Sequence, residues 1–256
     1  MMNLIYFFIV VFANIIGSFS GMGGGIIIKP LVSIASHLPL ETVLFYSNLS
    51  IIVMCFTSFI YSQWKKTTKY GKDALYICLG SLTGGLAGSI LLNLGLSSLE
   101  SIMKELQIAL TIITIVAGIW YQCKGKPVQH LWTKPWKIFC IGAIMGAFSI
   151  LLGIGGGPLN VLLLMMLLGF PLKKATSYSL ISVLGSVSIR VIMSFDHIHQ
   201  IQYQTSTMLV FMGSAFVGAI IGILIKKHLN MKNFKKLYIS TLGGVILLNI
   251  INLFIG

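Results

Sequence analysis

The chain has 256 residues, of which 56% are hydrophobic and 9% are charged, and its mean hydropathy is +0.95. A formal charge of +13 would suggest a nucleic-acid partner for a soluble protein, but one soluble core of this size cannot bury so much apolar surface. The composition therefore excludes a soluble nucleic-acid-binding protein and predicts a protein of the lipid bilayer.

Eight apolar stretches approach the length of about 20 residues that a membrane-spanning helix needs. They cover residues 4–20, 42–61, 74–95, 106–121, 136–152, 175–194, 204–225 and 237–255. None shows the alternation of barrel strands, so we expect an all-α polytopic membrane protein. The first stretch lacks the basic start and the cleavage site of a signal peptide, and it is interpreted as a retained segment.

Two glycine-rich breaks interrupt these stretches at an offset of 132 residues, from position 21 to position 153. The first reads Gly21-Met22-Gly23-Gly24-Gly25 and the second Gly153-Ile154-Gly155-Gly156-Gly157. The same offset pairs Pro39 with Pro171, Leu40 with Leu172, Tyr46 with Tyr178 and Ser47 with Ser179. This pattern predicts a duplicated unit, with one transmembrane repeat over 1–123, a cytoplasmic linker over 124–135 and a second repeat over 136–256.

A short apolar arm follows each break, over residues 26–36 and 158–169. Each arm would make roughly 16 to 18 Å of helix, which is too short for a hydrocarbon core of about 30 Å. Broken helices are tolerated inside a membrane where they are buried in protein or line a polar cavity. In transporters, paired broken segments indicate the substrate site.

The basic residues predict the topology, because fifteen of the eighteen lie in four connections. These are Lys65, Lys66, Lys69 and Lys72; Lys124, Lys126, Lys134 and Lys137; Lys173 and Lys174; and Lys226, Lys227, Lys232, Lys235 and Lys236. The positive-inside rule places them in the cytoplasm, and the connections that carry Glu41, Glu100 and Asp196 outside.

Eight simple crossings would put the connections 62–73 and 226–236 on opposite faces, whereas a hairpin at each break puts both inside. We therefore expect two inverted repeats, each a glycine-broken hairpin plus three transmembrane helices, with the two breaks facing each other at the midplane. A re-entrant hairpin and a hairpin of two complete crossings give the same parity, and both remain open.

At the breaks the sequence resembles the TauE/SafE family of sulfite exporters and anion permeases. The resemblance rests on Gly21 to Gly25 followed by Pro30, and on Gly153 to Gly157 followed by Pro158. It also rests on Ala175-Thr176-Ser177 with Ser179 and Ser182. The stretch from Thr42 to Asn48 departs from the pattern, and Lys29 stands where an apolar residue is usual. The resemblance implies a small duplicated membrane carrier for sulfite, sulfonates or other small organic anions.

The candidate substrate-binding residues are the glycines of the breaks and the polar residues at matching distances after them. They are Gly21, Gly23, Gly24, Gly25, Lys29, Ser47, Asn48, Gly153, Gly155, Gly156, Gly157, Pro158, Thr176, Ser177 and Ser179. Backbone N–H groups at the start of each arm could converge on an anion, which the helix dipole also favours. The alternative for glycine is close helix packing, which suits Gly80, Gly84 and Gly88 or Gly218 and Gly222 better. No Gly-Lys-Ser/Thr follows either break, which argues against a nucleotide loop.

Two basic residues fall inside apolar stretches. Lys29 lies on the arm after the first break, where it is either a functional residue or a side chain that snorkels to the headgroups. Arg190 is close to the end of its stretch, where snorkelling is the favoured interpretation. The pair His197 and His199 lacks further metal ligands, and the four cysteines are single, so we expect neither a metal nor a cofactor.

These features together predict a secondary carrier of the plasma membrane that moves a small anion by alternating access around a midplane site. Its partners would be the anion, the bilayer and, as a coupling ion, H⁺ or Na⁺. A passive anion or ion channel is the alternative, because channels also use glycine-rich turns. No acid and base occur together at membrane depth, so we expect no enzyme.

Overall fold

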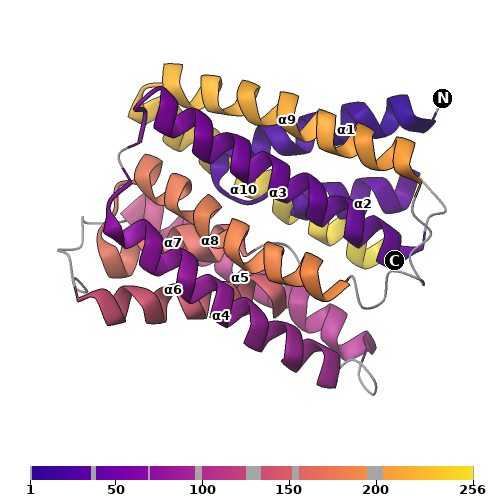
Figure 1. Cartoon of the computed structure of the whole chain (residues 1–256), viewed down its shortest axis with the longest axis horizontal. Helices are drawn as coiled ribbons and strands as arrows, with labels where there is room; N and C mark the ends of the chain where they lie inside the picture. The colour runs from indigo at the N-terminus through magenta and orange to yellow at the C-terminus, as the bar shows by residue number, and fades with distance from the viewer. Residues whose placement is uncertain are drawn as a thin grey trace.

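The computed structural model describes residues 2–35, 39–68, 70–95, 100–124, 134–151, 156–194 and 204–255, and in these ranges the chain is helical without strands (Figure 1). The helices are α1 (Met2–Ser20), α2 (Gly25–Ala35), α3 (Leu40–Trp64), α4 (Lys72–Gly95), α5 (Glu100–Lys124), α6 (Pro135–Leu151), α7 (Gly157–Leu168), α8 (Leu172–Ser194), α9 (Thr205–His228) and α10 (Met231–Ile255). The expected all-α fold is therefore confirmed.

The apolar stretches predicted from the sequence lie in the eight longer helices, and the two arms form α2 and α7. In the described residues, α1, α3, α4, α8 and α9 are long and apolar enough to cross a membrane. The arms have only 11 and 12 residues. The protein is thus a multi-pass membrane protein in which short helices follow the breaks.

The two halves match helix by helix at the predicted offset. Helices α2 and α7 begin at Gly25 and Gly157, and α3 and α8 begin at Leu40 and Leu172, each 132 residues apart. The starts of the other three pairs agree with this offset to within one residue. The contacts also correspond, since α4 packs on α6 as α9 packs on α1, and α8 packs on α4 as α3 packs on α9.

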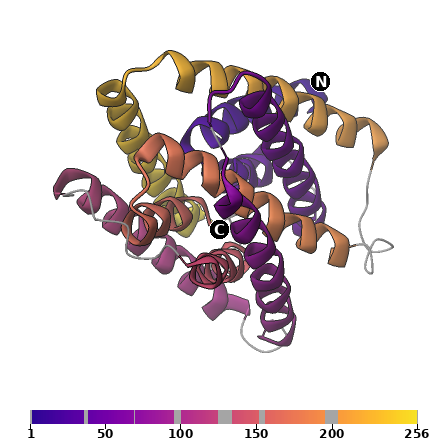
Figure 2. The ribbon, with the colours of Figure 1, turned by 60° about the vertical axis from the view of Figure 1, so that its left-hand side comes forward.

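The halves are nevertheless intertwined in space. Helices α9 and α10 pack on α1–α3, while α4 and α5 pack on α6–α8 (Figures 1 and 2). We call α1–α3 with α9 and α10 the first bundle, and α4–α8 the second bundle. Each half of the sequence thus gives its last two helices to the bundle formed by the other half. The bundles join where α3 packs on α8 and where α5 packs on α10.

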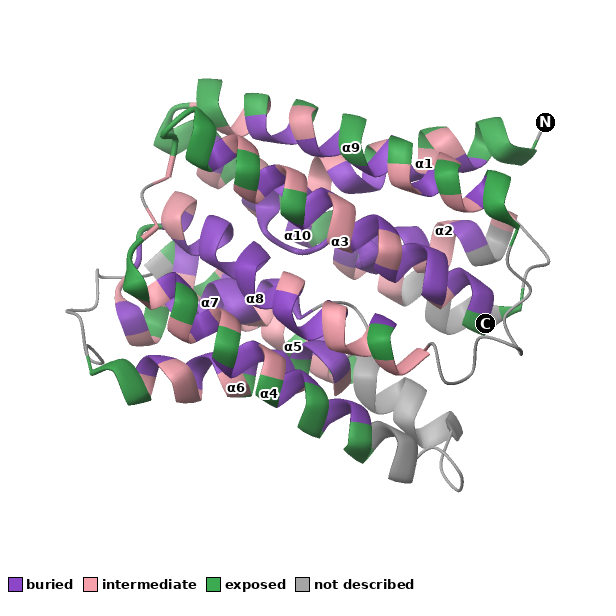
Figure 3. Cartoon of the chain, in the orientation of Figure 1, coloured by how far each residue is buried: buried purple, intermediate pink, exposed green. Residues whose placement is uncertain are grey.

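Burial separates a central helix from lipid-facing ones (Figure 3). In α8, 67% of the most apolar window is buried, against 39% in α1 and in α9. The exposed faces of the outer helices carry large apolar side chains, including Leu4, Phe8 and Phe12 on α1. Such a surface suits lipid, and α8 occupies the middle of the protein.

Glycines bring the helices of each bundle close together, as the small-residue spacing predicts. Gly80 and Gly84 of α4 lie directly against the backbone of α6 at Phe139 and Ala143. Gly218 and Gly222 of α9 lie against the backbone of α1 in the same way. A methyl group at any of these positions would overlap the neighbouring helix, so this set of glycines serves packing.

Two tyrosines that recur at the repeat offset hydrogen-bond to the helices that each half contributes to the other bundle. The Tyr46 hydroxyl accepts a hydrogen bond from the N–H of Gln204, the N-cap of α9, at 2.6 Å. The Tyr178 hydroxyl accepts one from the N–H of Gly71, immediately before α4, at 3.0 Å. Each tyrosine therefore satisfies a backbone donor at the start of a helix that comes from the other half.

We expect Tyr46→Phe and Tyr178→Phe each to lower the free energy of unfolding by about 1 kcal/mol, because each leaves a backbone N–H without its acceptor. Thermal unfolding of the detergent-solubilised protein would measure the loss. Tyr76→Phe is the matched control, since no described residue bonds the hydroxyl of this half-buried residue on α4. Equal unfolding midpoints in all three variants would contradict the proposed role.

Candidate functional site

The first break is a tight bend that only glycine accommodates easily. Helix α1 ends at Ser20, and the backbone then has a positive φ of 76° at Gly21, 82° at Gly23 and 55° at Gly24 before α2 begins. Residues with a Cβ rarely adopt such angles. The glycine cluster therefore turns the chain between two helices, as the sequence predicts.

Backbone donors at this bend are only partly used. The N–H of Gly21 donates to the carbonyl of Gly17 at 2.9 Å, and the N–H groups of Ile27 and Ile28 donate to the carbonyl of Gly24 at 3.0 Å. No described residue accepts a hydrogen bond from the N–H of Gly23 or Gly24. The start of α2 thus combines unused donors with the positive end of a helix dipole.

The described part of the second break has a similar geometry. Gly156 is the N-cap of α7 with a φ of 62°, and Pro158 lies in the first turn. The N–H of Asn160 donates to the carbonyl of Gly156 at 2.9 Å, and its side-chain amide donates to Ser149 Oγ at 3.2 Å. The predicted site residues Gly153 and Gly155 lie outside the described residues.

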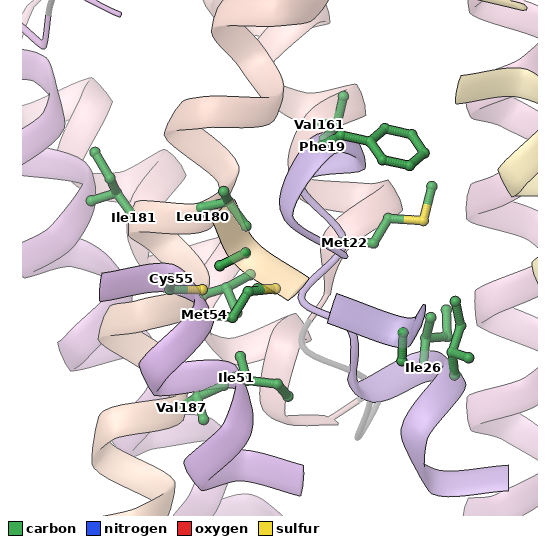
Figure 4. Packing of buried hydrophobic residues seen from close by; sticks show 14 of the residues in the cluster. Phe19, Met22, Ile26, Ile51, Met54, Cys55, Val161, Leu180, Ile181 and Val187 are labelled. Atoms are coloured by element: carbon green, nitrogen blue, oxygen red, sulfur yellow. The ribbon is translucent and has the colours of Figure 1, made fainter. Parts of the chain in front are cut away.

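The two breaks meet where the bundles join. Gly157 lies against the backbone of Met22, so a Cβ at Gly157 would overlap it. Figure 4 shows Met22 on the bend between α1 and α2. On the other side of the bend, Ser179 donates to the carbonyl of Gly21 at 2.7 Å. A Cβ on Gly21 would stand 2.6 Å from the carbonyl oxygen of Thr176.

Several buried oxygens around the breaks have no hydrogen-bond partner among the described residues. They are Asn14 Oδ1, Ser47 Oγ, Asn160 Oδ1 and Ser182 Oγ. A Cβ on Gly24 would stand 2.9 Å from Asn14 Oδ1, and one on Gly25 would stand 3.4 Å from Ser47 Oγ. An unpaired buried polar group costs about 1 to 3 kcal/mol. Such a cluster beside the bend therefore favours a polar ligand there.

Lys29 and Arg190 form a pair of cations next to this region. Lys29 is half-buried on α2, one turn after Gly25, and Arg190 is half-buried on α8. The two side chains lie close enough for their charges to repel each other. None of the hydrogen bonds among the described residues pairs either side chain with a carboxylate. The snorkelling expected for Arg190 stays a prediction.

The predicted candidates do not all gather at the breaks. Gly21, Gly25, Ser47, Thr176 and Ser179 lie together with Gly157, as described above. Asn48 is buried on α3, and no described contact connects it to the bend. Ser177 instead accepts a hydrogen bond from Lys226, which lies near the C-terminal end of α9.

Sequence reasoning missed Asn14 and Asn160. Asn14 is fully buried, and its side-chain amide donates to the carbonyl of Val10 at 2.8 Å and to Ser50 Oγ at 2.9 Å. Both asparagines were detectable as isolated amides, one in the apolar stretch before the first break and one in the arm after the second. A lone polar residue beside a break is therefore a signal worth including.

Comparison with known proteins agrees with this architecture. The sequence model of the family described as "Sulfite exporter TauE/SafE" matches residues 6–248. Over 210 residues the chain is 28% identical to the "Probable membrane transporter protein YunE" of Bacillus subtilis (strain 168), an alignment that covers 69% of this chain and 74% of that protein. The match spans both breaks and nearly all the helices, and the chain therefore belongs to the sulfite exporter TauE/SafE family of multi-pass membrane transporters.

Proposed function

We propose that this protein is a secondary carrier that moves a small anion, such as sulfite, a sulfonate or another organic anion, across the cell membrane. The observation that carries the proposal is the meeting of the two glycine breaks at the join between the bundles, with the buried hydroxyls of Ser47 and Ser182, which no described residue bonds, as donors in the same region. Irregular backbone at a join between two helical units is the arrangement in which transporters of this type bind their substrates.

The chemistry of the site suits an anion with several oxygens. The N–H groups of Gly23 and Gly24, from which no described residue accepts a hydrogen bond, and the hydroxyl of Ser47 can donate to such oxygens. The dipoles of α2 and α7 supply positive potential, and the charges of Lys29 and Arg190 add to it. No carboxylate belongs to the described part of this site, so an anion would meet no opposing charge from it.

Transport requires the two bundles to move apart. Residues 21–28 are all buried, and Gly157 lies directly against Met22, so the described residues of the two breaks are in contact. We therefore propose that the moving units are the first and second bundles, which rock against each other. The two halves of the sequence do not move as units. The intertwined packing makes each bundle the rigid unit, because its helices touch along glycine-lined faces.

The inverted arrangement of the halves is part of this proposal, and cysteine labelling tests it. We expect single cysteines at Lys66, Lys126, Lys174 and Lys232 to be protected from an impermeant maleimide in intact cells, because these positions face the cytoplasm. Cysteines at Glu41, Ser98 and His199 should react. Labelling of both position 66 and position 126 from outside would contradict the inverted topology.

Counterflow in proteoliposomes tests the carrier mechanism. Vesicles loaded with unlabelled sulfite should transiently accumulate labelled sulfite against its gradient, and the initial rate should saturate. The assay repeated with imposed H⁺ or Na⁺ gradients identifies the coupling ion. Flux that stays proportional to concentration, without counterflow, would instead support a channel.

A further inference from the structure

We propose a second oxyanion site, formed by Lys226, Lys173, Ser177 and Thr68, at the end of the protein where α3, α9 and the connections after them lie beside the start of α8. This site would load the transported anion, and in that respect it rests on the proposed function. We call this end the lysine-rich end, because it carries the lysines at positions 65–66, 173–174 and 226–227 (Figure 1). Nothing in the preceding site uses these four side chains.

The hydrogen bonds at this place converge on one buried hydroxyl. Lys226 Nζ donates to Ser177 Oγ at 2.7 Å, and Thr68 Oγ1 lies 3.1 Å from the same oxygen. Ser177 in turn donates to the carbonyl of Lys173 at 3.1 Å. The Ser177 side chain is 3% exposed, whereas Thr68 and both lysines are half-buried. The cluster therefore extends from solvent towards the protein interior.

The two ammonium groups retain unused donors. Each carries three N–H groups, and the described contacts use one of them, to Ser177 for Lys226 and to the carbonyl of Leu229 at 2.5 Å for Lys173. The two lysines also lie close enough to repel each other. Half-buried like charges are costly unless an anion compensates them.

No hydrogen bond among the described residues pairs either lysine with a carboxylate. The protein has five acidic residues. Glu41 lies at the start of α3, Glu100 and Glu105 lie at the start of α5, and Asp196 lies outside the described residues. Asp73, in the first turn of α4, is the described acidic residue at the lysine-rich end. The described hydrogen bonds of Lys173 and Lys226 go to a hydroxyl and a carbonyl, not to Asp73.

Neighbouring tyrosines pack beside the cluster without adding negative charge. Tyr70 packs on Tyr178 with ring centroids 5.4 Å apart. Burial raises the pKa of Tyr70 to about 12, while hydrogen bonds with Ser62 and Ser177 act against that rise. The phenol therefore stays neutral at physiological pH and adds no negative charge to the cluster.

The site also has the right position for loading the breaks. Lys226 belongs to the first bundle, while Lys173 and Ser177 belong to the second, so an anion held here would be bound by both bundles. Thr176, the residue before Ser177, lies against Gly21 of the first break. The lysine cluster and the first break therefore contact neighbouring residues of α8.

Thermal unfolding of the purified protein with sodium sulfite or sodium sulfate, at ionic strength held constant with sodium chloride, tests the site. We expect both oxyanions to raise the unfolding midpoint of the wild type. Lys226→Met should weaken this binding about tenfold or more, because it removes a charged donor. Lys227→Met is the matched control, since it removes the same charge from an exposed neighbour on α9. Ser177→Ala provides a second variant if Lys226→Met is unstable.

Transport kinetics separate this inference from the proposed function. Lys226→Met should raise the KM for sulfite flux about tenfold with little change in kcat, while Gly24→Val should abolish flux and retain sulfite-dependent stabilisation. Unchanged stabilisation and KM in both Lys226→Met and Ser177→Ala would overturn the loading site and leave the transport proposal intact. Normal flux in Gly24→Val, with binding lost in Lys226→Met, would do the reverse.

A lipid phosphate has the same oxyanion chemistry, and a reconstituted sample distinguishes it. The unfolding midpoint is compared in vesicles of phosphatidylcholine alone and with added phosphatidylglycerol, for wild type, Lys226→Met and Lys227→Met. Because Ser177 is buried, we expect stabilisation by sulfite in both lipids. Stabilisation that needs Lys226 and phosphatidylglycerol, with no response to sulfite, would overturn the assignment to a free anion.

Discussion

Gly24→Val and Gly156→Val should each reduce anion flux about a hundredfold or more while the protein remains folded in the membrane. Both glycines have a positive φ, of 55° and 62°, which a β-branched residue adopts only under strain of about 1 to 3 kcal/mol. A Cβ on Gly24 would also stand 2.9 Å from Asn14 Oδ1, and one on Gly156 would stand 2.7 Å from the Cα of Ser149. Displacing reacting or binding groups by about 1 Å is enough for an effect of this size.

Labelled-sulfite uptake, normalised to the folded protein in the vesicles, measures this prediction. Gly243→Val is the matched control, because Gly243 lies in α10 with nothing within 4 Å of an added Cβ. Gly24→Ala should give a smaller loss than Gly24→Val, since it adds less bulk at the same φ. Normal affinity and flux in both valine variants would show that the breaks take no part in transport.

Lys29→Met should weaken anion affinity by roughly 2 kcal/mol, which corresponds to about thirtyfold. The substitution keeps the length and apolar bulk of the side chain but removes a charge that lies beside Arg190 and one turn from the first break. Calorimetric titration with sulfite measures the change. Lys232→Met, at an exposed position in the first turn of α10, controls for net charge.

The double variant tests whether the two cations act together. If Lys29 and Arg190 attract the same anion, Arg190→Met should also lower the affinity, and its effect should be smaller in a Lys29→Met background than alone. Independent, additive effects would indicate separate roles. An unchanged affinity in Lys29→Met would assign this lysine to snorkelling and leave the backbone of the breaks as the anion site.

Much of the helical framework could be predicted from the sequence. Apolar length located the eight longer helices, and the 132-residue offset related their starts, because both signals are local in the chain. The glycine breaks were also visible in the sequence. The structure gives Gly21, Gly23 and Gly24 positive φ values, which residues with a Cβ rarely adopt. The short arms followed from the distance between each break and the next polar connection.

The exchange of helices between the halves was not predictable in this way. A repeat indicates that two segments are alike, but it does not indicate whether α4 packs on its own half or on the other half. The same limit affected the site. Ser177 and Thr176 are adjacent, yet one bonds Lys226 and the other touches Gly21, because successive residues of α8 point in different directions.

The tyrosines have a structural role that repetition alone did not reveal. Tyr46 and Tyr178 recur at the repeat offset. In the structure their hydroxyls accept from the backbone N–H groups of Gln204 and Gly71. A residue can recur because each half needs the same helix start to be satisfied, and the sequence does not distinguish that need from ligand binding.

The reciprocal tyrosine contacts also bear on how such a chain could have arisen. Each half contains both members of the exchange, a tyrosine on its third helix and a helix start that receives the tyrosine of the other half. Two separate copies of one half could therefore complete each other as a homodimer, with each lending two helices to its twin. In the present protein both halves lie in one polypeptide, and each half carries a basic residue, Lys29 or Arg190, whose counterpart at the repeat offset is Val161 or Ser58.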